Sequence, residues 1–539
     1  MLQALNADYE VDVLIIGFGG AGACAAVEAQ AAGVSTLILE KQPENKHHSN
    51  TRMSGGGFHC PAESGDFESI KAYAKAMFSG ENLPYKLEGE QPEFSDDLAH
   101  AWAVYAPQNN NFMRSLDPQF KAVGSANAAF VDFPGAERSG YAVLRSTYVG
   151  ESYDAAESAH TQFAEKSVKE AGEAFHTCLE VGIKSRGIPV HYDTAADALI
   201  VDEAGAVIGL YALRAGKKLC YLARRAVIIA SGGFEYNTRM RKAFLDGPGK
   251  EGWAFYGSPA NTGDGIRMAM KVGAALAKVG SVAGRVICAI PERRHGLKIG
   301  FNTSSVGKPN EIVVDNLGRR YSAERRITKD PSRYIFWKEA MQFDTVNLTY
   351  PRIPSWMIFD STLFNAGALI AAASAAYNDI DWDKGNLNAL KQGWILQGET
   401  IEALAEKIRA HPDNKTLMNT QTLIDQVNTW NRYCEKGVDE DFQADPKTMG
   451  PVVKAPFYAL ALYPGGPNTK GGIRANAKRE VLDWEDQPIA RLYTAGEISS
   501  AFQFVYQGGG NLAECIVFGR IAGINAAALA PWSRPMTPM

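Results

Sequence analysis

A glycine loop near the N-terminus is the first segment whose residue types and spacing could do chemistry. Gly17, Gly19 and Gly22 follow an apolar run at residues 12–16 and precede an alanine-rich stretch. Glycines at this spacing leave backbone amides and a helix N-terminus exposed at one point, and both stabilise a pyrophosphate. Glu40 ends a second apolar run, where its carboxylate can accept hydrogen bonds from ribose hydroxyls. This order of strand, loop, helix, strand and acid predicts a dinucleotide-binding βαβ unit.

Three later segments favour FAD over NAD as the dinucleotide. Residues 49–57 read Ser-Asn-Thr-Arg-Met-Ser-Gly-Gly-Gly, a polar loop suited to bond the heteroatoms of a flat ring system. Residues 230–233 and 494–497 are junctions between a strand and a glycine turn, far from the first loop along the chain. A dinucleotide with a long ribityl arm needs such extra anchors, whereas NAD generally does not.

The strand signals of this nucleotide-binding part occur at both ends of the chain. Residues 226–230 and 491–495 are both short apolar runs typical of buried parallel strands. Residues 285–454 alternate less regularly and are richer in Pro, Trp and charged residues. We therefore expect an α/β protein with an FAD-binding domain formed by residues 1–284 and 455–539. Residues 285–454 are expected to be an inserted α+β domain that caps the site and holds the substrate.

Length, composition and charge narrow the class of protein. The chain has 539 residues, enough for two domains of unequal size, and its 46% hydrophobic and 21% charged residues are ordinary for a globular protein. A net charge of −5 gives no reason to expect nucleic acid or an anionic membrane as partner. The first ten residues lack the pattern of a secretory signal, and no run of about 18 apolar residues occurs. We expect a cytoplasmic protein with no membrane span.

The cysteines show no pattern that would hold a metal, a haem or a cluster. Seven are scattered along the chain, without CxxC and without paired spacing. The sequence therefore predicts reduced thiols and no metal site. Each cysteine is expected to be a small buried hydrophobe rather than a catalyst.

With these motifs in order, the chain resembles the FAD-dependent fumarate reductase and succinate dehydrogenase flavoprotein superfamily, and within it the 3-ketosteroid dehydrogenases. The shared motifs are G-x-G-x-x-G…E, N-[ST]-x-x-S-G-G, A-[ST]-G-G, Gly-Asp-Gly at residues 263–265, and the closing T-A-G-E…G-G-N…F-G-R-x-A-G. They span residues 11–525, whereas the inserted domain matches only at residues 315–321, similar to N-x-x-G-x-R-[FY]. The resemblance implies a Rossmann-like FAD domain of the glutathione-reductase type.

The motifs and the resemblance together predict the residues that contact FAD. They are Gly17, Gly19, Gly20, Ala21, Gly22, Glu40, Lys41, Asn50, Thr51, Ser54, Gly55, Gly56, Ala196, Ser231, Gly232, Gly496, Glu497, Asn511 and Leu512. In membrane-bound succinate dehydrogenases a histidine before the flavin loop forms a covalent bond to FAD. Ser49 stands at that position here, with His48 one place away, so non-covalent FAD is expected.

The resemblance separates two branches by the substrate that they hold. Fumarate reductases grip two carboxylates with cations, but Gln507 stands where their C-terminal arginine is found. Residues 467–472, P-N-T-K-G-G, lack both histidines of their H-H-T-x-G-G, and Thr328 replaces their proton-donating arginine. Without bidentate contacts a dicarboxylate would be poorly held, so another substrate class is expected.

The same positions are similar to those of the ketosteroid dehydrogenases. By this resemblance the Tyr506 hydroxyl and the Gly510 amide hold a substrate ketone oxygen. Two donors aimed at a carbonyl stabilise the enolate that forms when an α-proton leaves. The resemblance points to Tyr334 as the proton-abstracting base, with an insertion at residues 326–332, and a packing tyrosine is the alternative. Nearby arginines would have to lower the pKa of this tyrosine from about 10.

The residues that would line a substrate pocket are less defined. Phe502, Phe504, Trp356 and Phe359 could surround a ring, but aromatic residues at such spacing are also typical of a core. A steroid, a bile-acid-like molecule or a simple cyclic ketone would all suit this description.

The sequence therefore predicts an FAD-dependent dehydrogenase that forms a C=C bond beside the carbonyl of a cyclic ketone, either a 3-ketosteroid or a smaller ring ketone. A flavin suits this reaction because the C–C bond being oxidised has no heteroatom to push electrons. The electrons would pass to an unidentified acceptor. The alternatives are a reductase of an activated C=C bond, in an enone or a urocanate- or fumarate-like acceptor, and a catalytically silent flavin-bound module.

Overall fold

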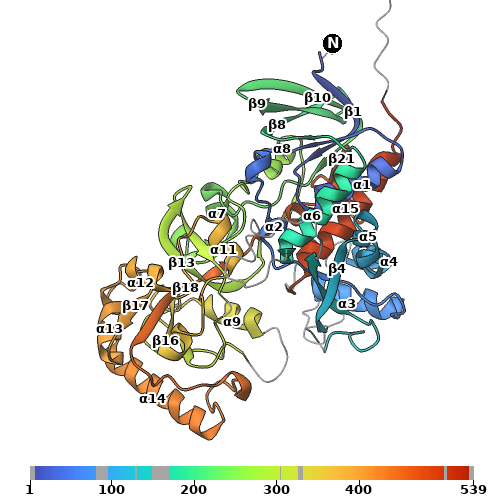
Figure 1. Cartoon of the computed structure of the whole chain (residues 1–539). Helices are drawn as coiled ribbons and strands as arrows, with labels where there is room; N and C mark the ends of the chain where they lie inside the picture. The colour runs from blue at the N-terminus through green and yellow to red at the C-terminus, as the bar shows by residue number, and fades with distance from the viewer. Residues whose placement is uncertain are drawn as a thin grey trace, which may run out of the picture.

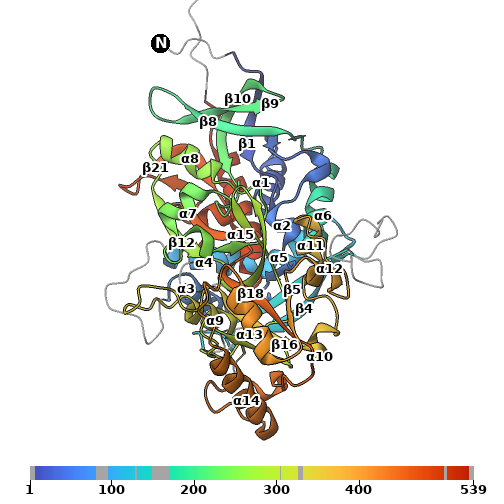
Figure 2. The ribbon, with the colours of Figure 1, turned by 90° about the vertical axis from the view of Figure 1, so that its left-hand side faces the viewer.

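Segments from both ends of the chain form one half of the molecule, and the middle of the chain forms the other half (Figure 1). The computed structural model describes residues 6–80, 95–127, 130, 132–148, 169–303, 305–325, 332–502, 505 and 507–532. The two views agree in placing the strands of the second half at the end of the molecule away from β8, β9 and β10 (Figure 2). The predicted α/β fold, with an FAD-type domain assembled from both chain ends, is confirmed.

An eight-stranded sheet is the scaffold of the first half, with the central order β20-β21-β10-β1-β2-β7. Its strands are β1 (Tyr9–Ile16), β2 (Thr36–Leu39), β7 (Val190–His191), β8 (Thr194–Val201), β9 (Val207–Arg214), β10 (Lys217–Ile229), β20 (Glu480–Leu482) and β21 (Pro488–Thr494). Strands β2, β1, β10 and β21 run parallel, and their register places Leu39, Ile16, Ile229 and Thr494 side by side. These four strands therefore end at one edge of the sheet.

Helices cover both faces of this sheet, which explains why the last residues of β1 and all of β2 are buried and mostly apolar. The helices of this half are α1 (Gly20–Ala31), α2 (Asn50–Met53), α3 (Phe67–Ser79), α4 (Ser95–Tyr105), α5 (Asn109–Leu116), α6 (Ala171–Ser185), α7 (Thr238–Phe244), α8 (Asp264–Lys271) and α15 (Gly510–Ala528). Two smaller sheets complete it, β3-β5-β4 with β6, and the antiparallel pair of β12 and β19. Their strands are β3 (Gly57–His59), β4 (Phe120–Asn127), β5 (Ala142–Tyr148), β6 (Lys169–Glu170), β12 (Leu276–Val282) and β19 (Thr469–Ile473).

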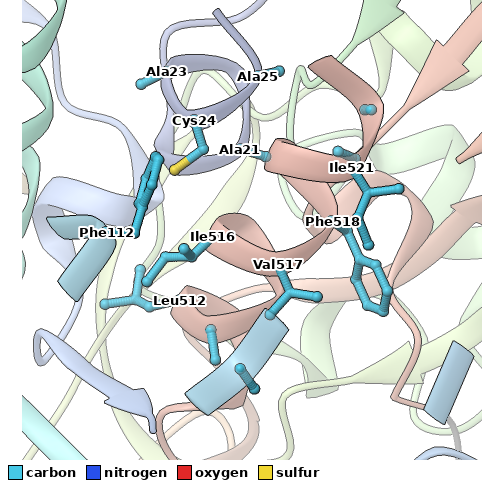
Figure 3. Close-up of a cluster of buried hydrophobic side chains, with 14 of the residues drawn as sticks. Ala21, Ala23, Cys24, Ala25, Phe112, Leu512, Ile516, Val517, Phe518 and Ile521 are labelled. Carbon is cyan, nitrogen blue, oxygen red and sulfur yellow. The ribbon is translucent and has the colours of Figure 1, made fainter. Parts of the chain in front are cut away.

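The first and last helices of this half pack against each other and tie the two ends of the chain together. Figure 3 shows side chains of α1 and α15 within one buried cluster. Small residues allow this approach: a Cβ at Gly519 would lie 2.6 Å from the Ala21 carbonyl oxygen, and one at Gly523 would lie 2.3 Å from that of Ala25.

A seven-stranded sheet with the central order β11-β14-β13-β18-β16-β15 forms the second half. Its strands are β11 (Ala254–Phe255), β13 (Arg285–Arg294), β14 (Leu297–Phe301), β15 (Glu311–Val314), β16 (Ser355–Asp360), β17 (Leu396–Gly398) and β18 (Phe457–Gly466). Its helices are α9 (Ser332–Ala340), α10 (Ser361–Phe364), α11 (Ala372–Tyr377), α12 (Leu387–Lys391), α13 (Ile401–Ala410) and α14 (Thr420–Lys436). Buried clusters lie on both faces of this sheet.

The limits of the second sheet differ from the expected inserted segment, residues 285–454. Strand β13 begins at Arg285, the first residue of that segment, but β11 precedes it and β18 follows residue 454. Both of these strands pair within the second sheet because their partners, β14, β13 and β16, belong to it. Pairing across such distances leaves no local signal in the sequence.

All seven cysteines lie in the described part of the chain, and none forms a disulfide. Within the same described segments, no helix combines the length and the apolar composition that crossing a bilayer requires.

Replacing Gly519 with valine should destabilise the protein, because its Cβ would meet the Ala21 carbonyl oxygen and push α1 and α15 apart. We expect the free energy of unfolding to fall by about 1–3 kcal/mol, a typical cost of overpacking. Equilibrium urea unfolding followed by circular dichroism measures this change. Ile524→Ala on the exposed side of α15 is the control and should change stability by less than about 1 kcal/mol. Equal effects of the two substitutions would show that the helix contact is not tightly packed.

Candidate functional site

A cavity of about 860 Å³ lies where the parallel strands of the first sheet end, and residues of both halves line it. Every residue predicted to contact FAD lines this cavity except Gly22. The loops that follow β1, β2, β10 and β21 meet there because these strands end side by side. The carboxyl edge of a parallel sheet is also where open α/β folds bind their ligands.

The glycine loop gives the cavity an open backbone wall. Gly17 has φ +102°, and a Cβ there would lie 2.5 Å from the Ala230 carbonyl oxygen, so β1 and β10 need glycine at this turn. Gly22 lies behind the loop, where a Cβ would stand 2.0 Å from the Gly17 carbonyl oxygen. A Cβ at Gly19 would meet nothing closer than Thr51 Oγ1 at 3.7 Å, and one at Gly55 would meet nothing within 4 Å. Side chains at these two positions would fill space that the cavity uses.

Glu40 is buried at the end of β2 and is held as an anion. Its carboxylate accepts hydrogen bonds from the amides of Phe18 at 2.9 Å and Gln42 at 2.8 Å. The His47 ring nitrogen Nε2 lies 3.5 Å from the same carboxylate. Burial alone would raise the pKa of Glu40, but the hydrogen bonds from His47, Gln42 and Phe18 outweigh it and lower the pKa below its ordinary value. A fixed carboxylate at this place suits ribose hydroxyls.

The flavin loop predicted from residues 49–57 contains a short helix, α2, which the Ser49 side chain caps. Thr51 Oγ1 accepts a hydrogen bond from the Gly20 amide at 2.9 Å, which joins this helix to the glycine loop. His48 is half-buried, its ring centre 4.8 Å from that of Tyr377, and it does not line the cavity.

Two carboxyl groups meet beside the cavity, and the sequence predicted only one of them. Asn50 Nδ2 donates to Glu235 and to Glu497, each at 2.8 Å. Thr469 Oγ1 lies 3.1 Å from Glu235 and 3.3 Å from Glu497, and Asn261 donates to Glu235 at 2.8 Å. Both glutamates are buried, and burial raises the pKa of each. The negative charge of Glu235 raises the pKa of Glu497 further, and Glu497 is the one of the two that lines the cavity.

Four of the cavity-lining residues have a buried polar atom with no hydrogen-bond partner in the described part of the chain. These atoms are Ser231 Oγ, Arg285 Nε, Asn511 Oδ1 and Gln507 Nε2. Unsatisfied buried polar groups are costly, so these atoms are suited to a ligand that supplies the missing partners. Together with the open glycine wall, they show that the residues present fit a dinucleotide with a polar ring system.

The side chain of Gln507 is oriented by a neighbouring tyrosine. The Tyr73 hydroxyl accepts a hydrogen bond from the Phe130 amide at 3.3 Å and donates to Gln507 Oε1 at 2.9 Å. Since Oε1 is occupied in this way, the amide NH₂ of Gln507 remains as the free donor. Gln507 is 1% exposed, so this orientation is protected from water.

A second buried pair supports the loop that contains Gln507. His59 Nε2 lies 3.0 Å from the Gly508 carbonyl oxygen, and its Nδ1 bonds the Tyr141 hydroxyl. Burial lowers the pKa of His59 to about 3, so the ring is neutral. The neutral imidazole of His59 therefore links the Tyr141 hydroxyl to the Gly508 carbonyl and has a structural role.

Buried charges hold the segment just before Gln507. Lys278 Nζ donates to the carbonyl of Ala501 at 2.8 Å, and Lys470 Nζ donates to that of Phe502 at 3.2 Å. Glu514 of α15 accepts the Ala501 amide at 3.2 Å. Burial lowers the pKa of Lys470 and raises that of Glu514. These contacts fix the backbone at Ala501 and Phe502, which follow β21.

The structure describes the three residues predicted to act on the substrate to different extents. Gly510 begins α15, and its amide donates to the Gln507 carbonyl at 3.0 Å, so it already has a partner. Tyr506 lies outside the described residues, as does Thr328. Tyr334 belongs to α9, but its side chain also lies outside the described part.

The end of the cavity toward the second sheet has both apolar and polar walls. Val286, Val306 and Phe336 are its apolar lining. Trp356 and Phe359, which could have lined a pocket, are buried in β16 and belong to the core. Phe504 lies outside the described residues, and Phe502 is buried against Trp102.

Several polar residues here were not singled out from the sequence. Arg285, Asn302 and Thr303 line the same end, as do Glu324 and Arg325. The motif at residues 315–321 adjoins Glu324 and Arg325, but the other three residues belong to no motif. No signal in the linear sequence marks them.

Comparison with known proteins places this chain among flavoproteins. Residues 12–512 match the family described as FAD binding domain. The 3-oxosteroid 1-dehydrogenase of Mycolicibacterium smegmatis is 27% identical over 97% of this chain and 98% of that protein. The NADH:acrylate oxidoreductase of Vibrio harveyi is 27% identical over 96% of this chain and 50% of that protein. The 3-ketosteroid delta1-dehydrogenase of Sterolibacterium denitrificans, solved with 1,4-androstadiene-3,17-dione, has a TM-score of 0.77 at 22% identity, covering 96% of this chain and 100% of that one.

Replacing Glu40 with glutamine should weaken FAD binding, because the neutral amide cannot keep the charge-assisted hydrogen bonds that Glu40 makes. Hydrogen bonds to charged groups contribute about 1.5–3 kcal/mol, so the Kd should rise about 10- to 100-fold. Titrating the FAD-free protein with FAD and following flavin fluorescence measures this change. Glu44→Gln, an exposed glutamate in the next turn, is the matched control and should leave the Kd unchanged. An unchanged Kd in Glu40→Gln would exclude Glu40 from the cofactor site.

Replacing Glu497 with glutamine should change how stability depends on pH. A carboxyl whose pKa is raised on folding destabilises the fold progressively as pH rises above its unfolded value of about 4.3, and below that pH the penalty is absent. The FAD-free variant lacks this penalty, so it should gain stability over the wild type between about pH 4 and pH 8. Urea unfolding across this range measures the difference. Exposed Glu485→Gln should show a constant difference from the wild type, and the same flat result for Glu497→Gln would contradict a raised pKa of Glu497.

Proposed function

This chain belongs to the FAD binding domain family, and from that premise we propose that it is an FAD-dependent dehydrogenase of cyclic ketones. Its substrate would be a 3-ketosteroid or a smaller ring ketone, and its product the α,β-unsaturated ketone. The similarity to a 3-oxosteroid 1-dehydrogenase over 97% of the chain supports this reaction class. Bound FAD would supply the two-electron acceptor for the hydride that leaves the β-carbon.

Different segments of the cavity wall would hold different parts of FAD, without a covalent bond. The glycine loop and the start of α1 would hold the pyrophosphate, and Glu40 the ribose. Asn50, Glu497 and Asn511 would bond the polar edge of the flavin. Ser49 caps α2 at the position of the family's covalent histidine, which supports non-covalent attachment.

The neutral amide donor of Gln507, three residues before α15 begins, is the observation that carries this proposal. Gln507 occupies the place of an arginine that grips carboxylates, and its free NH₂ lines the cavity. Together with the Tyr506 hydroxyl, and with the Gly510 amide once it releases the Gln507 carbonyl, it would polarise a ketone oxygen. These donors would stabilise the enolate that forms as the α-proton leaves. Tyr334 of α9 is the proposed base on the ground of the family resemblance, and α9 also contributes Phe336 to the cavity wall.

A reductase of activated double bonds is the second candidate. The NADH:acrylate oxidoreductase that matches 96% of this chain favours it. The same donors would then polarise an enone carbonyl, and a proton would be delivered rather than removed. Reoxidation of the reduced enzyme by an enone, and not by the saturated ketone, would favour this direction.

Anaerobic mixing of the FAD-loaded enzyme with a saturated 3-ketosteroid should bleach the flavin band at about 450 nm. Tyr506→Phe should keep its FAD but slow this bleaching by about 10²–10³-fold, since one donor to the developing oxyanion is lost. Tyr9→Phe, at a partly exposed position on β1 outside the cavity, is the control and should bleach at the wild-type rate. An unchanged rate in Tyr506→Phe would remove its assigned role. The absence of bleaching by any ring ketone would overturn the dehydrogenase.

A further inference from the structure

Strand β13 carries three arginines, and one of them has no acidic partner. Arg293 pairs with Glu251 at 2.6 Å, and Arg294 pairs with Asp379 at 3.4 Å. Arg285, at the start of the strand, makes no ion pair with any residue that the structure describes. Its recorded hydrogen bond is from Nη1 to Asn302 Oδ1 at 3.1 Å, and its Nε is buried without a partner.

This guanidinium lines the cavity and is held in place. Asn302 is fixed on both sides of its backbone, since its amide donates to Ser374 Oγ at 3.2 Å and its carbonyl accepts the Ala371 amide at 2.9 Å. By accepting from Nη1, Asn302 leaves the other nitrogens of Arg285 unused. A half-buried guanidinium with a free edge is suited to a carboxylate, which it can bind through two parallel hydrogen bonds.

A hydroxyl donor lies on the same stretch of the cavity wall. Thr303 Oγ1 accepts the Ser305 amide at 3.1 Å, so its own proton remains available to a ligand. Three polar groups of different chemistry, Arg285, Asn302 and Thr303, therefore line one end of the cavity. Together these three groups favour a ligand group that is rich in oxygen and negatively charged.

Other charged groups also line this end of the cavity, but none of those that the structure describes forms an ion pair with Arg285. Burial raises the pKa of both Glu324 and Glu311, and the negative charge of Glu324 raises that of Glu311 further. The Asp445 carboxylate caps the turn that follows it and accepts the Lys447 amide at 3.0 Å. Arg145 and Arg325, both exposed, also line the cavity and add positive charge.

We propose that Arg285, with Asn302 and Thr303, is a subsite for one carboxylate on the substrate. The inference rests on the dehydrogenase proposed above and narrows its substrate to a ring ketone that carries a single carboxylate. Among the cavity-lining arginines, Arg285 is the half-buried one that Asn302 anchors, and its guanidinium would bind this one anion; Arg145 and Arg325 are exposed. Val286, Val306 and Phe336 would contact the apolar body between the ketone and the carboxylate.

The test compares a 3-keto cholanoic acid with its methyl ester, which differ in this one charge. Isothermal calorimetry with the FAD-loaded enzyme should give a Kd for the acid at least about 10-fold lower than for the ester. Arg285→Met should abolish this preference, and Arg285→Lys should restore only part of it, because an ammonium cannot bind a carboxylate in the same bidentate way. Raising the salt concentration should weaken binding of the acid but not of the ester.

Arg293→Met is the matched control, since it removes an arginine of the same strand that does not line the cavity. It should keep the full preference for the acid, and both variants should retain the wild-type ratio of flavin to protein absorbance. Equal affinity of the wild type for acid and ester, or a preserved preference in Arg285→Met, would overturn the subsite. Preference for the acid without flavin bleaching would support the subsite and count against the dehydrogenase.

Discussion

The alignment of four parallel strand ends is the constraint on which this molecule depends. Ile16, Leu39, Ile229 and Thr494 lie in register, so the loops that follow them must share one edge of the sheet. Two of these strands come from the N-terminal segment, one from the middle and one from near the C-terminus. The close packing of α1 on α15 keeps this arrangement together, and glycines on α15 allow the necessary approach. A cavity lined by segments more than 400 residues apart is the direct consequence.

Buried polar groups give this cavity three electrostatic zones. Glu40 is kept ionised by hydrogen bonds from surrounding groups, as a ribose acceptor should be. Burial raises the pKa of Glu235 and of Glu497, and the charge of Glu235 raises that of Glu497 further. Gln507 and Arg285 contribute donors toward the second half. The pKa of a glutamate is thus lowered at Glu40 and raised at Glu497, because desolvation and hydrogen bonding differ from place to place.

The nucleotide part of the site could be read from the sequence because its residues belong to short contiguous motifs. Gly17 and Gly22 are required by contacts within a single turn and by the neighbouring strand, so spacing alone identifies them. The partners of these motifs could not be found in this way. Glu235 and Glu497 both bond Asn50, and Tyr73 orients Gln507, which lies 434 residues away in the sequence. No local sequence pattern indicates either contact. The predicted Gly510 amide likewise has a partner that only the folded turn reveals.

Local chemistry was therefore enough to establish the βαβ unit, the dinucleotide type and the family of the chain. Backbone requirements such as a positive φ or a missing Cβ act over a few residues, and the order of residues records them directly. The protonation of Glu497, the orientation of Gln507 and the free edge of Arg285 were decided by tertiary structure alone. Each of these depends on burial and on groups brought from distant segments, and a charge or a hydrogen bond takes its strength from its surroundings in space.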